Sequence, residues 1–193
     1  MALDFANTVT ARDTIPRDWL DGYARLLEWA RMAKVIDARA NARLAAAADD
    51  APLDAAAALG RARKLREALH DVCVALLDGT TAASSALGEI EGAWKRAAER
   101  ARLTAHDGLL HLEPDPQASA LDLPLDRVVF AAVDLLGELD ADRTRVCRGP
   151  DCGWLFVDTS KSGRRVWCDM GTCGNTAKSQ RFARAAKRRR RAR

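Results

Sequence analysis

The chain has 193 residues, of which 48% are hydrophobic and 30% are charged, and its formal net charge is +4. This length allows one ordinary domain with a small appended module. No apolar run is long enough to span a membrane, and the first ten residues lack the apolar core of a signal peptide. We therefore expect a cytoplasmic protein that does not bind membranes.

The charge is divided unevenly along the chain. Residues 1–142 carry 16 Lys and Arg against 24 Asp and Glu, a net charge of −8. Residues 143–193 carry 15 against 3, a net charge of +12. This asymmetry predicts two domains with different tasks, an acidic helical domain over residues 1–142 and a basic binding module over residues 143–193.

The first half of the chain reads as a series of helices. The first is expected to begin near Pro16, which suits the first helical position. Apolar residues then recur at helical spacing from Trp19 onward over residues 19–33, which predicts one buried stripe. A second helix is expected over residues 37–48. A longer third helix follows to about residue 78, where Gly79 supplies a stop.

Further helices are expected before the basic module. One covers residues 83–103 and is followed by a short strand over residues 108–113. The segment 122–139 has apolar residues on more than one face, so we expect it to be the central and most buried helix. Cys73 lies on the apolar stripe of the third helix and is expected to be a small core residue rather than a reactive thiol.

Four cysteines near the C-terminus form two C-x4-C pairs separated by fifteen residues: Cys147, Cys152, Cys168 and Cys173. Two pairs of thiolates can meet at tetrahedral geometry around one Zn²⁺, and four thiolates leave no open position for a substrate water. We therefore expect one structural zinc ion per chain. The alternatives are a disulfide or redox pair and unliganded core cysteines, although the odd total of five cysteines argues against a secreted disulfide framework.

Short strands are predicted around these cysteines, at residues 145–147, 154–157 and 165–168. A helix should begin just after Cys173, with Asn175 as its cap. The fold class is therefore mainly α, with a multi-helix N-terminal domain followed by a small treble-clef-like zinc finger with short strands and a basic C-terminal helix. The aromatic residues of the module are expected to form its small core, with base stacking as the alternative: Trp154, Phe156 and Trp167.

The cysteine-rich stretch resembles the CGNR zinc-finger family over residues 147–160 and 165–178, including Cys173-Gly174-Asn175. The opening segment over residues 3–8 and the later segments over residues 19–20 and 27–30 resemble the ABATE domain that precedes this finger. The resemblance implies a bacterial transcription regulator whose helical domain senses a small molecule or a stress signal. It also assigns the four cysteines as metal ligands. The family motif ends in arginine where this chain has Thr176, so any contact of that arginine must be made otherwise or not at all.

The C-terminal helix is expected to bind nucleic acid. Phe182 should face the zinc core together with small residues. The opposite face should contact phosphates and base edges through Lys178, Gln180, Arg181, Arg184, Lys187, Arg188 and Arg191. We expect double-stranded DNA as the partner, with RNA binding or a zinc-stabilised protein-interaction scaffold as the alternatives. The simplest competing explanation is an arginine cluster that only keeps the chain soluble.

No catalytic site can be assembled from the sequence, so we expect no enzymatic activity. The histidines His70, His106 and His111 show no metal-ligand spacing and are expected to be exposed or hydrogen-bonded structural residues.

The N-terminal motif allows two interpretations. It consists of Asp4, Phe5, Asn7 and Thr8. These residues either line a pocket for a small-molecule effector, or Phe5 packs in the core while the polar residues cap a turn. A homodimer would place two basic helices on adjacent DNA half-sites.

Overall fold

The computed structural model describes residues 1–12 and 14–191, apart from the side chains at positions 186 and 188–191. The chain divides into two compact units, each with its own hydrophobic cluster. Unit 1 consists of Met1–Thr8 and Trp19–Leu139, and unit 2 consists of Val9–Asp18 and Asp140–Arg193. The segment Val9–Asp18 therefore belongs with the C-terminal part of the chain, although it lies within the first 142 residues.

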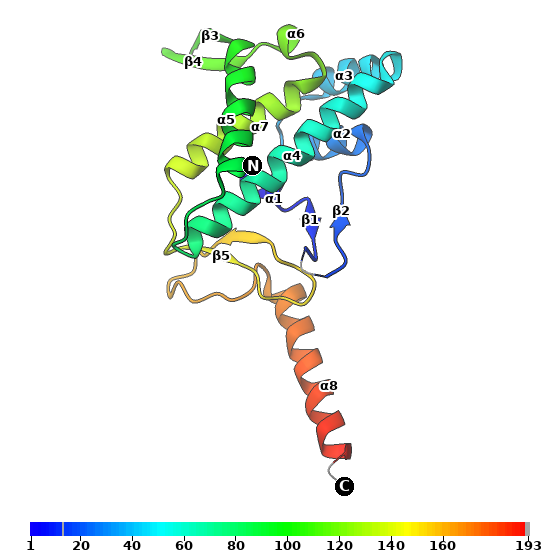
Figure 1. The fold of residues 1–193 in the computed structure, drawn as a ribbon, viewed down its shortest axis with the longest axis vertical. Helices are drawn as coiled ribbons and strands as arrows, with labels where there is room; N and C mark the ends of the chain where they lie inside the picture. The colour runs from blue at the N-terminus through cyan, green and yellow to red at the C-terminus, as the bar shows by residue number, and fades with distance from the viewer. Residues whose placement is uncertain (13, 192–193) are drawn as a thin grey trace. The chain divides into compact units, whose positions relative to one another are not determined.

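Unit 1 is mainly helical (Figure 1). Its longer helices α4, α5 and α7 pack on one another, and α1 and α2 pack on α4 and α7. Its elements in chain order are α1 (Ala2–Ala6), α2 (Tyr23–Met32), α3 (Ala38–Asp50), α4 (Pro52–Leu77), α5 (Ser84–Glu99), β3 (Ala101–His106), β4 (Leu109–Pro114), α6 (Pro116–Ser119), η1 (Ala120–Asp122) and α7 (Leu123–Gly137).

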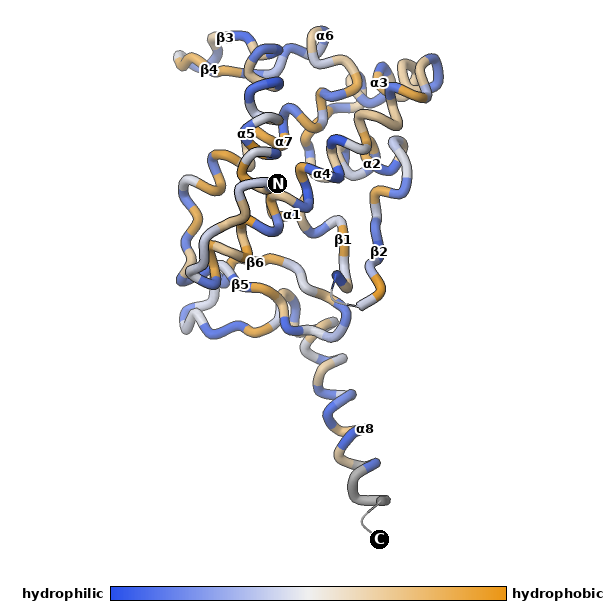
Figure 2. Tube along the Cα trace, viewed as in Figure 1, coloured by the Kyte–Doolittle hydropathy of each residue, from blue (hydrophilic) through white to orange (hydrophobic). Residues whose placement is uncertain are grey.

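The core of unit 1 follows from the helical spacing of apolar residues. On α4 the buried residues include Leu65, Leu69 and Val72, and on α7 they include Val128 and Val129. Figure 2 shows hydrophobic residues recurring along these helices between hydrophilic ones. Each fully buried side chain of this size stabilises the fold by about 1.5–3 kcal/mol. Packing of these stripes therefore holds the helices together.

Several predicted elements of this unit are confirmed within a few residues. The second helix is α3, whose cap Asp37 accepts a hydrogen bond from the backbone N–H of Ala40 at 2.7 Å. The third is α4, which ends before Gly79, a residue with φ of 63°. Cys73 on α4 is fully buried, and burial raises the pKa of its thiol to about 11. It is therefore the core residue that its position predicted.

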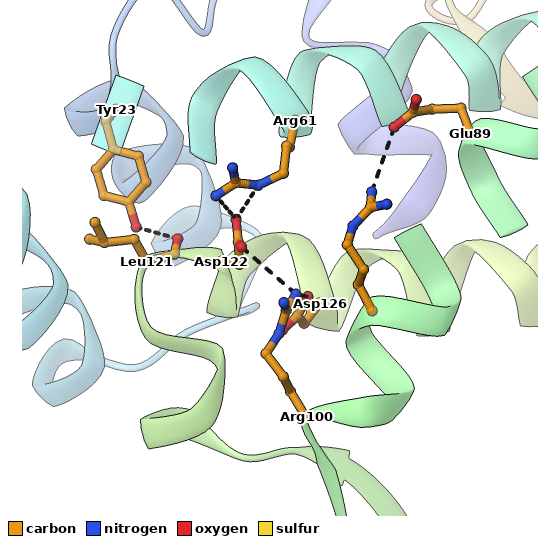
Figure 3. Close-up of polar contacts among 8 residues, drawn as sticks. Tyr23, Arg61, Glu89, Arg100, Leu121, Asp122 and Asp126 are labelled. Atoms are coloured by element: carbon orange, nitrogen blue, oxygen red, sulfur yellow. Dashed lines mark hydrogen bonds and ion pairs between the residues drawn. The ribbon is translucent and has the colours of Figure 1, made fainter. Parts of the chain in front are cut away.

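A polar network crosses the interior of unit 1 (Figure 3). Arg100, just after α5, donates two hydrogen bonds to the buried carboxylate of Asp126 on α7. Arg61 on α4 donates to Asp122 at 2.8 Å, and the Tyr23 hydroxyl donates to a backbone carbonyl of η1 at 2.7 Å. Burial raises the pKa of the Tyr23 hydroxyl above its usual value, with the Asp122 carboxylate as the second cause. The network thus joins the end of α5 with α2, α4, η1 and α7 through charges that are buried or partly buried.

Unit 2 contains short strand pairs and one long helix. Its elements are β1 (Val9–Thr10), β2 (Arg17–Asp18), β5 (Thr144–Val146), β6 (Leu155–Val157), the π-helical turn η2 (Met170–Gly174) and α8 (Asn175–Arg191). The pairs β1–β2 and β5–β6 are both antiparallel. The first cysteine pair lies between β5 and β6, and Cys173 lies in η2 directly before α8. The predicted fold class is confirmed: the protein is mainly helical, with short strand pairs near a four-cysteine cluster in its C-terminal region.

The helix predicted near Pro16 begins only at Tyr23. Residues 17–18 pair with β1 instead, so their backbone hydrogen bonds run across a hairpin rather than along a helix. Trp19, which was expected in the buried stripe, is 59% exposed. This prediction was wrong because proline is favourable both at the first position of a helix and directly before a short edge strand, so Pro16 alone does not distinguish the two.

Two predicted boundaries near β-structure also differ. The helix expected over residues 83–103 ends at Glu99, because residues 101–106 pair with β4 along their whole length. In the described structure residues 165–168 form no strand. Their loop is instead held by a hydrogen bond from the Arg148 N–H to the Val166 carbonyl and by one from the Arg165 N–H to the Asp158 carboxylate.

Candidate zinc site and nucleic-acid interface

The four predicted cysteines meet in one cluster. Their Sγ atoms all lie within 4.8 Å of one another. The Sγ of Cys168 is 3.8 Å from that of Cys152 and 3.7 Å from that of Cys173. These separations are those of four thiolates arranged around one small ion, and none of the cysteines is paired in a disulfide.

The cluster lies in a small hydrophobic core. Cys147 is 4% exposed and Cys152 is 8% exposed, and Phe156 packs with them. The partly buried rings of Trp154 and Trp167 complete this core. These aromatic residues therefore serve the packing of the module, as expected, rather than standing free for base stacking.

Backbone groups approach the sulfur atoms closely. The N–H groups of Gly149 and Cys168 both donate to the Cys147 Sγ at 3.3 Å. A Cβ at Gly149 would lie 2.7 Å from the Cys173 Cβ and 2.9 Å from its Sγ, so only glycine leaves room for the loop to pass the cluster. Donors that point at sulfur stabilise negative charge there, as a site of zinc thiolates requires.

The thiols differ in acidity when no cation compensates their charge. Burial by itself raises the pKa of Cys147, but hydrogen bonds from the backbone N–H groups of Cys168 and Gly149, together with those from the Cys152 and Cys168 thiols, outweigh it and lower that pKa. Burial raises the pKa of Cys152 to about 12 and raises that of Cys168, and the Cys147 sulfur adds to both shifts. Binding of zinc must therefore displace protons. The donor set, its spacing and its N–H donors fit one zinc ion per chain.

The loop between the two cysteine pairs is organised by Asp158. This residue is 1% exposed, and its carboxylate accepts hydrogen bonds from the N–H groups of Ser160 and Arg165 at 2.9 and 2.7 Å. The nearby Ser160 side chain, and then the N–H groups of Arg165 and Ser160, lower the pKa of Asp158 to about 2. Arg165 in turn donates to the Cys168 carbonyl and covers the Phe156 ring at 5.1 Å. Asp158 thus fixes the approach to the second cysteine pair.

The N-terminal hairpin β1–β2 also contacts the cysteine loop. The Ala11 N–H donates to the Cys152 carbonyl at 3.1 Å, and the Thr14 hydroxyl donates to the Asp151 carboxylate at 3.1 Å. Ala11 is buried and has φ of 57°, a left-handed conformation that is unusual for alanine. The hairpin therefore supports one metal-binding loop from outside the cysteine-rich stretch.

Helix α8 carries the expected basic side chains. Figure 2 shows it as largely hydrophilic. The residues of the predicted interface whose side chains are described are all exposed: Lys178, Gln180, Arg181, Arg184 and Lys187. Two further predicted contacts, Arg188 and Arg191, lie outside the described side chains. The described α8 residues thus present a surface with four positive charges and no acidic side chain.

Two details of α8 differ from the expectations. Phe182, expected to face the zinc core, is 75% exposed and is not part of the small hydrophobic core around the cysteines. Asn175 is the first helical residue rather than the cap, and its side-chain amide donates to the Gly171 carbonyl at 3.0 Å. The side chain of Asp169 instead accepts a hydrogen bond from the Thr172 N–H at the start of η2.

The four residues of the N-terminal motif do not converge on one cavity. Phe5 is completely buried and packs against Trp29 with ring centroids 5.0 Å apart. Thr8 donates to the Phe5 carbonyl at 2.7 Å, whereas the exposed Asp4 pairs with the N-terminal amine at 2.8 Å. Asn7 follows the last turn of α1, where its N–H bonds to a carbonyl of that helix. This geometry favours the interpretation as a core residue with a capped turn.

Sequence reasoning assigned no role to Gly149, Asp158 or Ala11. A signal for Asp158 existed, because an aspartate two residues before a serine is typical of a turn in which the carboxylate accepts a backbone N–H. A glycine between two close cysteines likewise indicates a loop with no room for a side chain. No local signal could have linked Ala11 to a loop about 140 residues later in the chain.

Two family models match the chain. Residues 1–138 match the ABATE family, described as "Putative stress-induced transcription regulator", and residues 143–193 match the CGNR zinc finger. A search of the curated proteins finds no significant match. Both matched families are of regulator and zinc-finger type rather than enzymes. Among the described residues, no helix combines the length and apolar character needed to cross a bilayer.

Proposed function

Since this chain belongs to the ABATE family and carries its C-terminal CGNR zinc finger, we propose that it is a zinc-dependent, DNA-binding transcription regulator. The observation that carries the proposal is the connection between cluster and helix. Cys173, in the four-cysteine cluster, lies one turn before the exposed basic side chains of α8. A metal held at this point fixes the start of the helix that would meet DNA.

The charge of this region supports nucleic acid as its partner. Residues 143–193 carry 15 basic and 3 acidic residues. Lys178, Arg181 and Arg184 follow one another at a spacing of three residues, so they lie on neighbouring parts of one helix face. Such a face contacts the phosphates of one strand, and Gln180 or Arg181 can reach base edges in the major groove.

The test is binding to duplex DNA at several salt concentrations, before and after removal of zinc by a chelator. About six phosphate contacts predict a log–log salt slope near −5. We expect the double variant Lys178→Ala with Arg181→Ala to reduce the steepness of this slope by about 2. The matched control is Arg31→Ala, an exposed cation on α2, which should leave the slope unchanged. Tight, salt-insensitive binding that survives chelation would overturn the proposal.

A second candidate is binding of RNA, which one observation favours. Phe182 is exposed on α8 between Arg181 and Arg184, where an aromatic ring can stack on an unpaired base. Stacking of this kind contributes about 1–3 kcal/mol per base. If Phe182→Ala weakens binding to single-stranded RNA about tenfold or more but leaves duplex DNA binding intact, the RNA alternative is preferred. A protein-interaction scaffold would bind neither nucleic acid at low salt.

The proposal includes a regulatory role for unit 1 and a homodimer. Because the N-terminal motif is spread between core and surface, a small-molecule effector would have to use other residues of unit 1. Two-fold dimerisation would place two α8 helices on adjacent half-sites. Sedimentation that finds one chain per particle at working concentration, with and without DNA, would contradict the dimer.

A further inference from the structure

The β3–β4 hairpin of unit 1 gathers two of the chain's three histidines on one face. In its antiparallel register Thr104 lies opposite His111, and His106 lies opposite Leu109. Residues two positions apart on a strand share a face, so His106 and His111 are diagonal neighbours on the same side. Glu113, opposite Arg102, follows on that side. The spacing in sequence hid this grouping, because the turn of the hairpin creates it.

The three side chains form a compact set of donor atoms. The rings of His106 and His111 are parallel within 4° and their centroids are 3.7 Å apart. Glu113 Oε1 lies 3.2 Å from His106 Nε2. One ligand atom from each of His106, His111 and Glu113 lies within 4.8 Å of the other two. Imidazole nitrogen with carboxylate oxygen is a donor set that suits Zn²⁺ and its neighbours among the transition metals.

A second observation points to a ligand at this position. Within the described structure, His111 Nε2 has no exposed surface and no hydrogen-bond partner. Leaving a buried polar atom without a partner is unfavourable. A metal ion that accepts the nitrogen lone pair removes this cost. On the other ring, Asp107 Oδ2 lies 3.5 Å from His106 Nδ1, the side from which a carboxylate orients a metal-binding imidazole.

We propose that His106, His111 and Glu113 bind a divalent transition-metal ion, in addition to the zinc of the four cysteines. Three protein ligands leave at least one coordination position for water or an exchangeable ligand. Two of the three residues are exposed, so the ion can first reach His106 and Glu113 from solvent. The hairpin therefore holds a weaker and more exchangeable metal than the four-thiolate cluster, and it fills only after that cluster is saturated.

The experiment uses the full chain already loaded with one zinc per chain, and ZnCl₂ as the probe. The protein is labelled at its histidine rings, which gives three sets of NMR signals because there are only three histidines. We expect a second equivalent of zinc to shift the signals of His106 and His111 and to leave those of His70 in place. Calorimetry should report the same second equivalent. Absence of a second equivalent, or shifts confined to His70, would overturn the proposal.

Variants assign the ligands separately. His111→Gln should weaken the second zinc equivalent at least about tenfold, since even residues that only orient ligands change metal affinity by 10–100-fold. The histidine control is His70→Gln on α4. Glu113→Gln should act like His111→Gln, and its control is Glu91→Gln, an exposed carboxylate on α5. A second equivalent that survives both His106→Gln and His111→Gln would contradict the assignment. The wild-type NMR titration remains decisive if a variant fails to fold.

Discussion

Gly149 leaves almost no free space between the two cysteine pairs. Its neighbours are the side chain of Cys173 and the sulfur of Cys147, both within 3.3 Å of where a Cβ would stand. The residue therefore sets how closely the β5–β6 loop can approach the second cysteine pair. A substitution of this residue is therefore expected to change the affinity for zinc rather than the stability of unit 1.

We predict that Gly149→Ala weakens zinc binding by about 10–100-fold, the range seen when groups that orient metal ligands are changed. The added methyl forces Cys173 or the loop to move. Competition with a chromophoric chelator measures the effect. Gly60→Ala is the control, because a Cβ there meets nothing within 4 Å and alanine favours the helical conformation of α4. Equal zinc affinity of Gly149→Ala and wild type would show that the loop relaxes freely.

Asp158 gives a prediction about pH. Its pKa in the folded protein is about 2, below the usual value near 3.9. Its stabilising effect is therefore present above about pH 4 and is lost as the pH falls toward 2. We expect Asp158→Asn to lower the thermal midpoint of unit 2 by a constant amount from pH 5 to 7, and by less below pH 4. A difference from wild type that persists unchanged at pH 2 would contradict this role.

At the scale of elements, the pair Arg100–Asp126 links the end of α5 to α7. Asp126 is buried and Arg100 is three-quarters buried, so removal of one partner leaves a charge without compensation in the core. We predict that Arg100→Leu destabilises unit 1 by about 3–5 kcal/mol. Chemical denaturation measures the loss.

The control for this pair is Arg25→Ala, which breaks an exposed ion pair with Glu28 on α2. Exposed ion pairs contribute little to stability because water screens them, so the control should stay close to wild type. If both variants lowered the free energy of unfolding by the same amount, the Arg100–Asp126 pair of Figure 3 would stabilise the protein no more than an exposed ion pair does.

The sequence was most informative where apolar residues or cysteines recur at one regular spacing. The apolar stripes of α4 and α7 and the two cysteine pairs could be located from spacing alone, because local geometry fixes which side chains share a face. β2 and β3 were missed because their residues are largely exposed on both faces, so no alternation marks them. The contact of Arg100 with Asp126 depends on a partner brought close only by tertiary folding, and the grouping of His106 with His111 depends on a hairpin whose first strand was predicted partly as helix.

At the scale of the whole molecule, the residues matched by the finger family are not the whole of unit 2. Val9–Asp18 belongs to that unit and contacts the loop of Cys152. We predict that a fragment of residues 140–193 binds zinc about tenfold or more weakly than the full chain, because this loop loses a backbone donor. Chelator competition on both proteins measures it. Full-length Ala11→Gly is the control, since glycine keeps the N–H and adopts φ of 57° without strain.

Equal zinc affinity of fragment and full chain would mean that the hairpin contacts the finger without contributing to zinc binding. Weaker zinc binding by the fragment would mean that the metal-binding fold includes the segment that starts at the ninth residue. Either result bears on how the family finger should be produced for DNA-binding measurements.

Because Val9–Asp18 is synthesised early but belongs to unit 2, its position affects the order in which the parts of the chain can fold. Thr14 leaves the ribosome 137 residues ahead of Asp151, the residue whose carboxylate it contacts. At about 5–20 residues per second, the hairpin is made about 7–27 seconds before its partner, while the helices between them emerge and can pack. The chain therefore captures zinc last, in a newborn protein whose helical part has already had time to fold.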